Sequence, residues 1–147
     1  MVVFLDTNVV IDYFGFREHS PEAKLIFDFC SEESNEGIIA SLSLATFFYV
    51  SRKALSAEER KEDIKTLASL FTIGSIDSET VSNALSYNMD DFEDALQVAC
   101  AVAAMADCII TNNPKDFVNA PVTVLTSSEF VERYCTRLCD REPRTET

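Results

Sequence analysis

The sequence predicts an α/β fold with three layers, α/β/α, in which helices cover both faces of a central, mostly parallel sheet. Short, continuous apolar runs are typical of strands that are buried on both faces. Here they alternate along the chain with segments of helical periodicity. In addition, residues 88–106 are apolar on two opposite sides, with Leu96 on one side and Met105 on the other. A helix of this kind lies between two layers.

The strands and helices can be placed along the chain from their local signals. Ser20-Pro21, Ser56 and Asp77 are typical helix starts. The expected strands are residues 2–5, 37–41, 71–76, 108–111 and 122–125. The expected helices are residues 9–14, 20–30, 43–55, 56–71, 77–87, 88–106 and 127–139. No repeat, low-complexity segment or linker interrupts this pattern, so we expect one domain over residues 1–140 and a charged tail over residues 141–147.

The charge of the chain restricts the partners that it can bind unaided. Its 147 residues include 25 acidic and 12 basic side chains, which gives a formal charge of −13. A passive nucleic-acid binder usually carries a basic stripe, and here no run of Lys and Arg is longer than Arg52-Lys53. An acidic chain can still act on nucleic acid if metal cations neutralise its site or if a basic partner supplies the charge. Taken alone, the charge is most simply explained by solubility.

The cysteines and the apolar runs indicate a protein of the cytoplasm. The cysteines are five in number, none of them forms a C-x-x-C pair, and the single histidine completes no zinc site. We therefore expect free thiols and a reducing compartment. No apolar run approaches the roughly 18 residues of a membrane helix, so we expect no membrane association.

Acidic and polar side chains follow the predicted strands. Asp6 follows the first strand, Thr111 ends the strand at residues 108–111, and Asp116 lies in the next loop. In open parallel sheets, ligands bind at the carboxyl ends of the strands. Each residue also has a simpler explanation, because Asp6 can cap the following helix and Asp116 can be a turn residue.

Asp94 is the acidic residue that is hardest to explain structurally. It lies one turn before Val98, on an apolar side of the helix predicted for residues 88–106. A carboxylate placed there is costly unless it is paired or binds a metal, and no Lys or Arg stands nearby in the sequence. Asp91 lies three residues earlier on the same side of that helix.

These residues together predict a hydrolase that uses a divalent metal. Carboxylates that converge on one edge repel each other, and Mg²⁺ or Mn²⁺ relieves that repulsion because both ions prefer oxygen ligands. Such an ion can activate water and stabilise charge at a phosphorus centre. With one histidine and no glycine-rich phosphate loop, the sequence offers no catalytic triad or P-loop. A phosphatase built on Asp6 is disfavoured, because no second Asp stands two residues later.

Three segments of the sequence resemble the PIN domain family. They are Phe4-Leu5-Asp6-Thr7-Asn8-Val9-Val10-Ile11-Asp12, Asp91-Phe92-Glu93-Asp94-Ala95-Leu96-Gln97 and Asp107-Cys108-Ile109-Ile110-Thr111-Asn112-Asn113-Pro114-Lys115-Asp116-Phe117. The resemblance covers nearly the whole chain and implies a PIN-like α/β/α fold. It also implies RNA cleavage that depends on Mg²⁺ or Mn²⁺. Because members of this family are often VapC-type toxins, the resemblance further implies the toxin of a toxin–antitoxin pair, with a basic antitoxin-like partner and a homodimer.

The resemblance also implies roles for individual residues. The catalytic and metal-binding acids would be Asp6, Asp94 and Asp116, with Asp91 as a further metal ligand. Residues in substrate-binding or auxiliary roles would be Thr7, Asn8, Thr46, Thr111 and Asn113. Thr46 departs from the family pattern, which usually has an acid early in the helix after the second strand. Two hypotheses therefore remain: a working ribonuclease, and a degenerate PIN module that binds a protein or RNA without cutting it.

Overall fold

The computed structural model describes residues 1–15 and 17–135, and it confirms the predicted three-layer α/β/α fold. Five parallel strands form one sheet in the order β3-β2-β1-β4-β5. The strands are β1 (Val2–Leu5), β2 (Glu36–Ala40), β3 (Thr72–Gly74), β4 (Cys108–Ile110) and β5 (Val124–Leu125). The predicted tail at residues 141–147 and the end of the predicted helix 127–139 lie outside the described residues.

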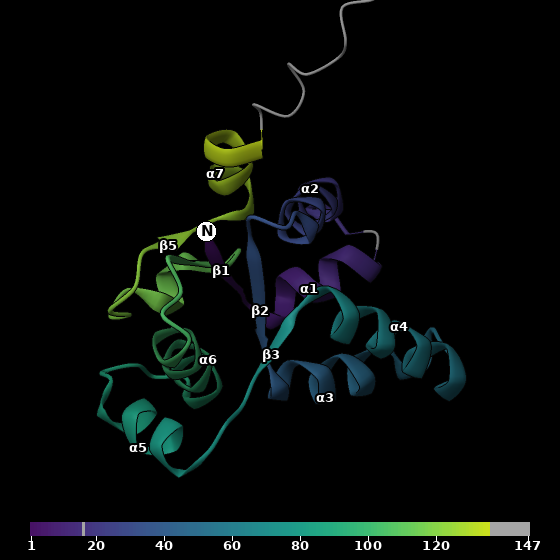
Figure 1. The fold of residues 1–147 in the computed structure, drawn as a ribbon. Coiled ribbons are helices and arrows are strands. Elements are labelled where there is room, and N and C mark those ends of the chain that lie inside the picture. The colour runs from purple at the N-terminus through teal and green to yellow at the C-terminus, as the bar shows by residue number, and fades with distance from the viewer. Residues whose placement is uncertain (16, 136–147) are drawn as a thin grey trace, which may run out of the picture.

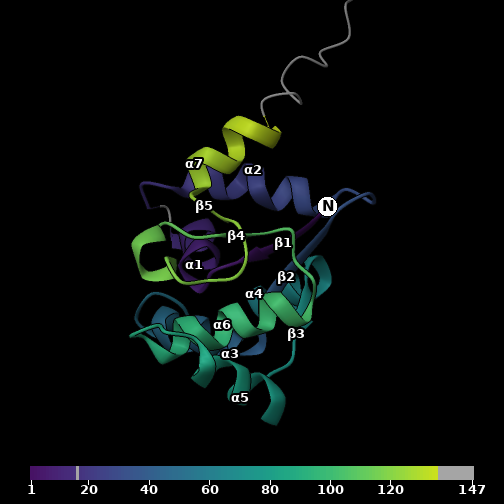
Figure 2. The same cartoon turned by 90° about the vertical axis from the view of Figure 1, so that its left-hand side faces the viewer.

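Helices cover the two faces of the sheet unequally (Figure 1). The helices on one side and at its edges are α1 (Thr7–Gly15), α2 (Ser20–Ser31), α3 (Ser41–Val50), α4 (Ala57–Leu70) and α7 (Ser127–Phe130). The other side carries α6 (Phe92–Ala103), with α5 (Ser78–Ser86) packed on its outer surface. The view in Figure 2 shows α7 beside α2, far from α5. Short helical turns complete the chain: η1 (Ser51–Lys53), η2 (Pro114–Phe117) and η3 (Val131–Cys135).

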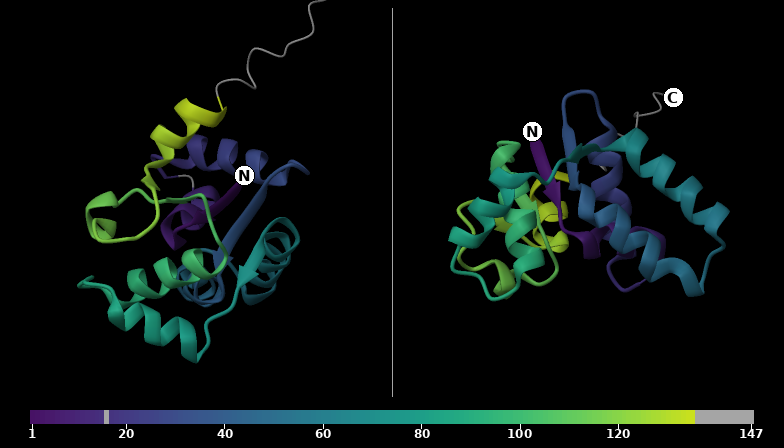
Figure 3. Two further views of the ribbon diagram at one scale, coloured as in Figure 1. Left: turned by 60° about the vertical axis from the view of Figure 1, so that its left-hand side comes forward. Right: turned by 90° about the horizontal axis from the view of Figure 1, so that it is seen from below.

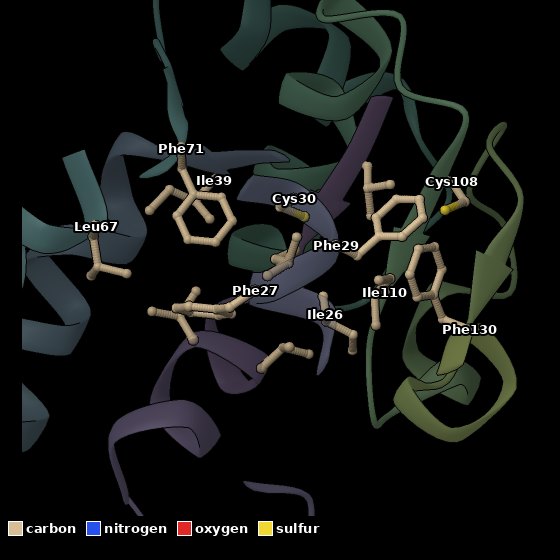
Figure 4. Close-up of a cluster of buried hydrophobic side chains, with 14 of the residues drawn as sticks. Ile26, Phe27, Phe29, Cys30, Ile39, Leu67, Phe71, Cys108, Ile110 and Phe130 are labelled. Carbon is tan, nitrogen blue, oxygen red and sulfur yellow. The ribbon is translucent and has the colours of Figure 1, made fainter. Parts of the chain in front are cut away.

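The core is built by the alternation of side chains along the strands. In β1, Val3 and Leu5 join the larger hydrophobic cluster, whereas Phe4 points to the opposite face and packs with Val98 of α6. Figure 4 shows part of the larger cluster, where side chains from the sheet meet those of α2 and α7. Within it, the ring of Phe29 lies edge-on to the ring of Phe130, with centroids 5.1 Å apart.

Gly37 of β2 is required by this packing. A Cβ atom at this position would lie 2.6 Å from the ring of Phe71 and 2.8 Å from the Cβ of Cys30. These distances are shorter than van der Waals contact, so a side chain here would push α2 away from the sheet.

Helix α6 lies between two layers, as predicted, but its ends differ from the prediction. The prediction that it begins at residue 88 was wrong, because Asp91 is its N-cap and its carboxylate accepts a hydrogen bond of 3.0 Å from the backbone N–H of Asp94. Met105 was expected on the buried side. It lies beyond the helix instead, 83% exposed and in the left-handed region with φ 53°.

The start of α3 also differs from the prediction. The second strand ends at Ala40, so Ser41 and Ser43 lie in the first turn of α3 and not at the strand end. Similarly, α1 begins at Thr7, which was expected to be a capping residue. Both helices therefore start directly at the carboxyl end of a strand, and their first turns line that edge of the sheet.

The sequence-based expectations about thiols and membrane-spanning helices can be compared with the described residues. Cys30, Cys100, Cys108 and Cys135 are buried free thiols. Among the described helices, none is both long and apolar enough to cross a membrane.

Candidate active site

A pocket of about 370 Å³ lies at the edge of the sheet where β1 and β4 end. The parallel pairing of these strands places Asp6, just after β1, beside Ile110 of β4, and the backbone N–H of Asp6 donates to the carbonyl of Ile110 over 3.0 Å. Figure 3 shows this part of the molecule from below, where the chain leaves the sheet for α1 and α3. Five acidic residues line the pocket: Asp6, Asp91, Glu93, Asp94 and Asp116.

Asp6 is buried and held on both carboxylate oxygens. The side-chain amide of Gln97 donates to Oδ1 over 3.0 Å, and the hydroxyl of Thr111 donates to Oδ2 over 2.8 Å. Burial raises the pKa of Asp6, and these two hydrogen bonds lower it without cancelling that effect. The carboxylate thus has a fixed orientation at the base of the pocket.

Gln97 connects Asp6 to the first turn of α1. Its side-chain carbonyl accepts a hydrogen bond of 3.1 Å from the backbone N–H of Thr7, while its amide group donates to Asp6. The hydroxyls of Thr7 and Ser43 lie 2.7 Å apart, which links α1 to the start of α3. These buried polar groups therefore satisfy each other, as buried groups must.

Asp94 is partly buried at the side of the pocket, one helical turn from Gln97. Burial raises its pKa, and the negative charges of neighbouring carboxylates raise it further, to about 7. Those neighbours, in order of effect, are Asp91, Asp6, Asp116 and Glu93. Burial and the same kind of repulsion also raise the pKa of Glu93. These five carboxylates therefore concentrate negative charge in the pocket.

Most of the residues named from the sequence line this pocket. They are Asp6, Thr7, Asn8, Thr46, Asp91, Asp94, Asn113 and Asp116. Thr111 lies behind Asp6, where its hydroxyl also accepts a hydrogen bond of 3.1 Å from the backbone N–H of Asn113. Asp91 has a structural role as well, since it caps α6.

Sequence reasoning missed three polar or charged residues of the pocket. Glu93 and Arg17 line it, and Gln97 holds Asp6. A signal for Gln97 was present, because it is the one polar residue in the apolar run 95–102 and lies three positions after Asp94. No signal distinguished Arg17, because its position depends on how the chain turns after α1.

The chemistry of the pocket residues fits a divalent cation. Carboxylates are the oxygen ligands that Mg²⁺ and Mn²⁺ prefer, and mutual repulsion among the pocket acids already raises the pKa of Asp94. Within residues 1–15 and 17–135, no three acidic, histidine or cysteine side chains converge closely enough to hold an ion as they stand. Asp116 is exposed and Asp94 is partly exposed, so side-chain rotation is needed to bring them toward Asp6.

Comparisons with known proteins agree with this geometry. The PIN domain family matches residues 2–115. Ribonuclease VapC1 of Aquifex aeolicus (strain VF5) is 28% identical over 141 residues, which cover 91% of this chain and 96% of that protein.

Solved structures show a similar fold. The structure of VapBC2 from Rickettsia felis, bound to a DNA fragment from their promoter, matches with a TM-score of 0.67 and 19% identity, over 86% of this chain and 98% of that one. A toxin–antitoxin complex from Klebsiella pneumoniae matches with a TM-score of 0.65 and 24% identity, over 85% and 97%. Since the family match spans most of the sequence and the fold agrees, the chain belongs to the PIN domain family.

Proposed function

We propose that this protein is a metal-dependent endoribonuclease and the toxin of a toxin–antitoxin pair. The observation that carries the proposal is the pocket in which a buried Asp6, hydrogen-bonded on both carboxylate oxygens, lies together with the mutually repelling carboxylates of Asp94 and Asp116. The likeness to a protein named Ribonuclease VapC1 supports the same activity.

Mg²⁺ or Mn²⁺ would be held by Asp6, Asp94 and Asp116, with Asp91 as a further ligand. When bound, the ion supplies an activated water and stabilises the charge that develops on the phosphate. The protein contributes the orientation of the ligands: Gln97 and Thr111 fix Asp6, and the cap of α6 fixes the backbone at Asp94. Asn8 and Asn113, which are exposed in the pocket, offer amide groups to the RNA.

Thr46 defines the second candidate function, a PIN module that binds without cutting. Thr46 lines the pocket where the family pattern has an acid. A hydroxyl is a neutral and weaker ligand than a carboxylate, so this side of the pocket binds a cation less strongly. We propose slow, strictly metal-dependent cleavage, because the other carboxylates are present.

The test is a cleavage time course on several RNAs with Mg²⁺, Mn²⁺ or EDTA. We expect fragments only in the presence of metal, and a loss on the order of 10²–10³ in rate for Asp6→Asn. Asp28→Asn is the matched control, because Asp28 is exposed on α2 and lines neither this pocket nor the pockets that adjoin it. If the wild-type protein matches Asp6→Asn on every RNA but still binds RNA, the binding module is the correct function.

We further propose a basic antitoxin as the protein partner. A second, largely apolar pocket of about 380 Å³ adjoins the acidic one and shares Ile11, Arg17 and Val50 with it. A peptide with an apolar anchor and a basic side chain complements both pockets and the charge of −13. Co-expression with the product of the neighbouring reading frame tests this: we expect a stable complex without ribonuclease activity.

The remaining proposals concern assembly and compartment. We propose a homodimer, which light scattering of the purified protein tests by its mass. We propose the cytoplasm as the compartment, because free thiols are stable where the environment is reducing.

A further inference from the structure

Two hollows meet at the carboxylates of the candidate active site. The acidic pocket of the candidate active site is the first hollow. It shares Asp91 and Asp116 with a second hollow, which is polar, has a volume of about 320 Å³ and is distinct from the apolar pocket proposed for the antitoxin. Lys115, Asn88 and Asn119 are among the residues that line this second hollow. The two shared carboxylates therefore stand between the hollows, and a ligand that lies across them occupies both.

Each hollow contains a single basic residue. Arg17 is the one Lys or Arg that lines the first, and Lys115 is the one that lines the second. The protein has a formal charge of −13. Arg17 and Lys115 therefore place two isolated positive charges beside the acidic residues that the hollows share. This arrangement differs from a basic stripe, which would bind a duplex along its length.

Arg17 lies near a buried carboxylate and keeps its donors free for a ligand. Its guanidinium lies 3.8 Å from the carboxylate of Asp12, and its side chain is 51% exposed. Asp12 is itself buried and accepts a hydrogen bond of 3.0 Å from the side-chain amide of Asn112. A guanidinium has five N–H donors in a planar arrangement that suits a phosphate. At 3.8 Å this ion pair is longer than a hydrogen bond, so the N–H donors of Arg17 remain available to a ligand.

Lys115 is positioned by the turn that also carries Asp116. It is exposed in η2, between Pro114 and Asp116, and among the residues that the structure describes it forms no ion pair. A lysine without a carboxylate partner at the rim of an acidic site is available to bind an anion.

We propose that one strand of RNA crosses both hollows, with Arg17 and Lys115 binding the phosphates on either side of the phosphate that lies at the carboxylates. This inference rests on the proposed function, to which it adds the path of the substrate. Without these two contacts, the negative charge of the pocket repels the flanking phosphates. With them, the strand is held at two points and its central phosphate is directed to Asp6, Asp94 and Asp116.

The experiment measures binding of a fluorescent single-stranded RNA of about twelve nucleotides by anisotropy. Ca²⁺ replaces Mg²⁺, and a gel verifies that the RNA stays intact. Arg17→Ala and Lys115→Ala are compared with Lys65→Ala, which removes the same charge from an exposed site on α4 that lines neither hollow. Arg17→Lys tests whether charge alone suffices at that position. Thermal melts verify that each variant is folded.

We expect Arg17→Ala and Lys115→Ala each to weaken binding roughly three- to tenfold at low salt. Each should also reduce the slope of log K against log salt by about 0.7, the value for one phosphate contact on a single strand. Arg17→Lys should keep the wild-type slope, and Lys65→Ala should change neither quantity. The proposal is overturned if Arg17→Ala and Lys115→Ala behave like Lys65→Ala.

The outcomes separate this proposal from the proposed function. If the protein cleaves RNA with Mg²⁺ or Mn²⁺ but the two variants bind normally, the path is wrong and the ribonuclease stands. If the variants lose binding as expected but no RNA is cleaved, the path stands in a protein that binds RNA without cutting it.

Discussion

Replacing Asp94 with Asn is expected to stabilise the metal-free protein, and to do so much more at pH 8 than at pH 4.5. Burial and neighbouring carboxylates raise the pKa of Asp94 from 3.8 to about 7. The folded protein therefore binds a proton more tightly than the unfolded chain, and stability falls as the pH rises from about 4 through 7. Asn carries no charge at either pH, so the variant avoids this loss.

The magnitude follows from the two pKa values. Each factor of ten between them is worth about 1.4 kcal/mol, so the upper limit at pH 8 is about 4 kcal/mol. Because Asp94 is partly exposed, solvent screening reduces that figure, and we expect a gain of about 1–2 kcal/mol. At pH 4.5, where Asp94 is protonated in the folded protein, the gain should be less than half as large.

Urea unfolding in EDTA at both pH values measures the free energy of unfolding. Asp90→Asn, which removes an exposed charge four residues earlier, should show no such dependence on pH. In Mn²⁺ the wild-type protein should gain stability and Asp94→Asn should gain less, since the ion binds the folded state through this carboxylate. An equal gain for Asp94→Asn at pH 4.5 and pH 8 would refute the idea that crowded carboxylates destabilise the pocket.

The remaining predictions concern the pocket and the packing. Thr46→Glu should raise the rate of RNA cleavage in Mn²⁺ by restoring a charged ligand; a slower variant in the same time course would contradict the proposed role of Thr46. Gly37→Ala should lower the free energy of unfolding by about 1–3 kcal/mol, because its Cβ would lie 2.6 Å from the ring of Phe71. A loss below about 0.5 kcal/mol in urea unfolding would contradict this, because it would show that the neighbouring side chains and α2 move aside at little cost. Met105→Gly should stabilise the protein by about 0.5–1 kcal/mol, since Met105 adopts φ 53° and is 83% exposed; Met105→Ala is its control, and equal melting temperatures of the two variants would contradict this.

The parts of the fold that the sequence predicted well depend on local signals. Ser56 and Asp77 form capping boxes at the starts of α4 and α5, as their sequences indicate. The strands were recognisable because they are short, apolar and buried on both faces. The start of α6 was less clear, since Asn88, Asp90 and Asp91 are all suitable N-caps, and tertiary packing selects among them.

One part of the candidate site could be predicted because strand ends determine it. Asp6 and Thr111 come together because parallel strands place their carboxyl ends at one edge. Gln97 is marked in the sequence only as a polar residue within an apolar run, which does not show that it holds Asp6, and no local pattern marks Arg17 as a pocket residue. Because tertiary packing decides where α6 begins, sequence analysis identified Asp91 as a metal ligand but not as the N-cap of α6.

The hydrogen bonds of Asp6 also bear on when the site forms during synthesis. Asp6 leaves the ribosome well before its partners Gln97 and Thr111, which follow 91 and 105 residues later. The central strand β1 likewise waits for β4 on one side. A chain that ends before β4 therefore has Asp6 without Thr111, one of the two side chains that orient it, and without Asp116. The site is completed only after the segment through Asp116 has been translated, so copies that end before it have no assembled carboxylate pocket.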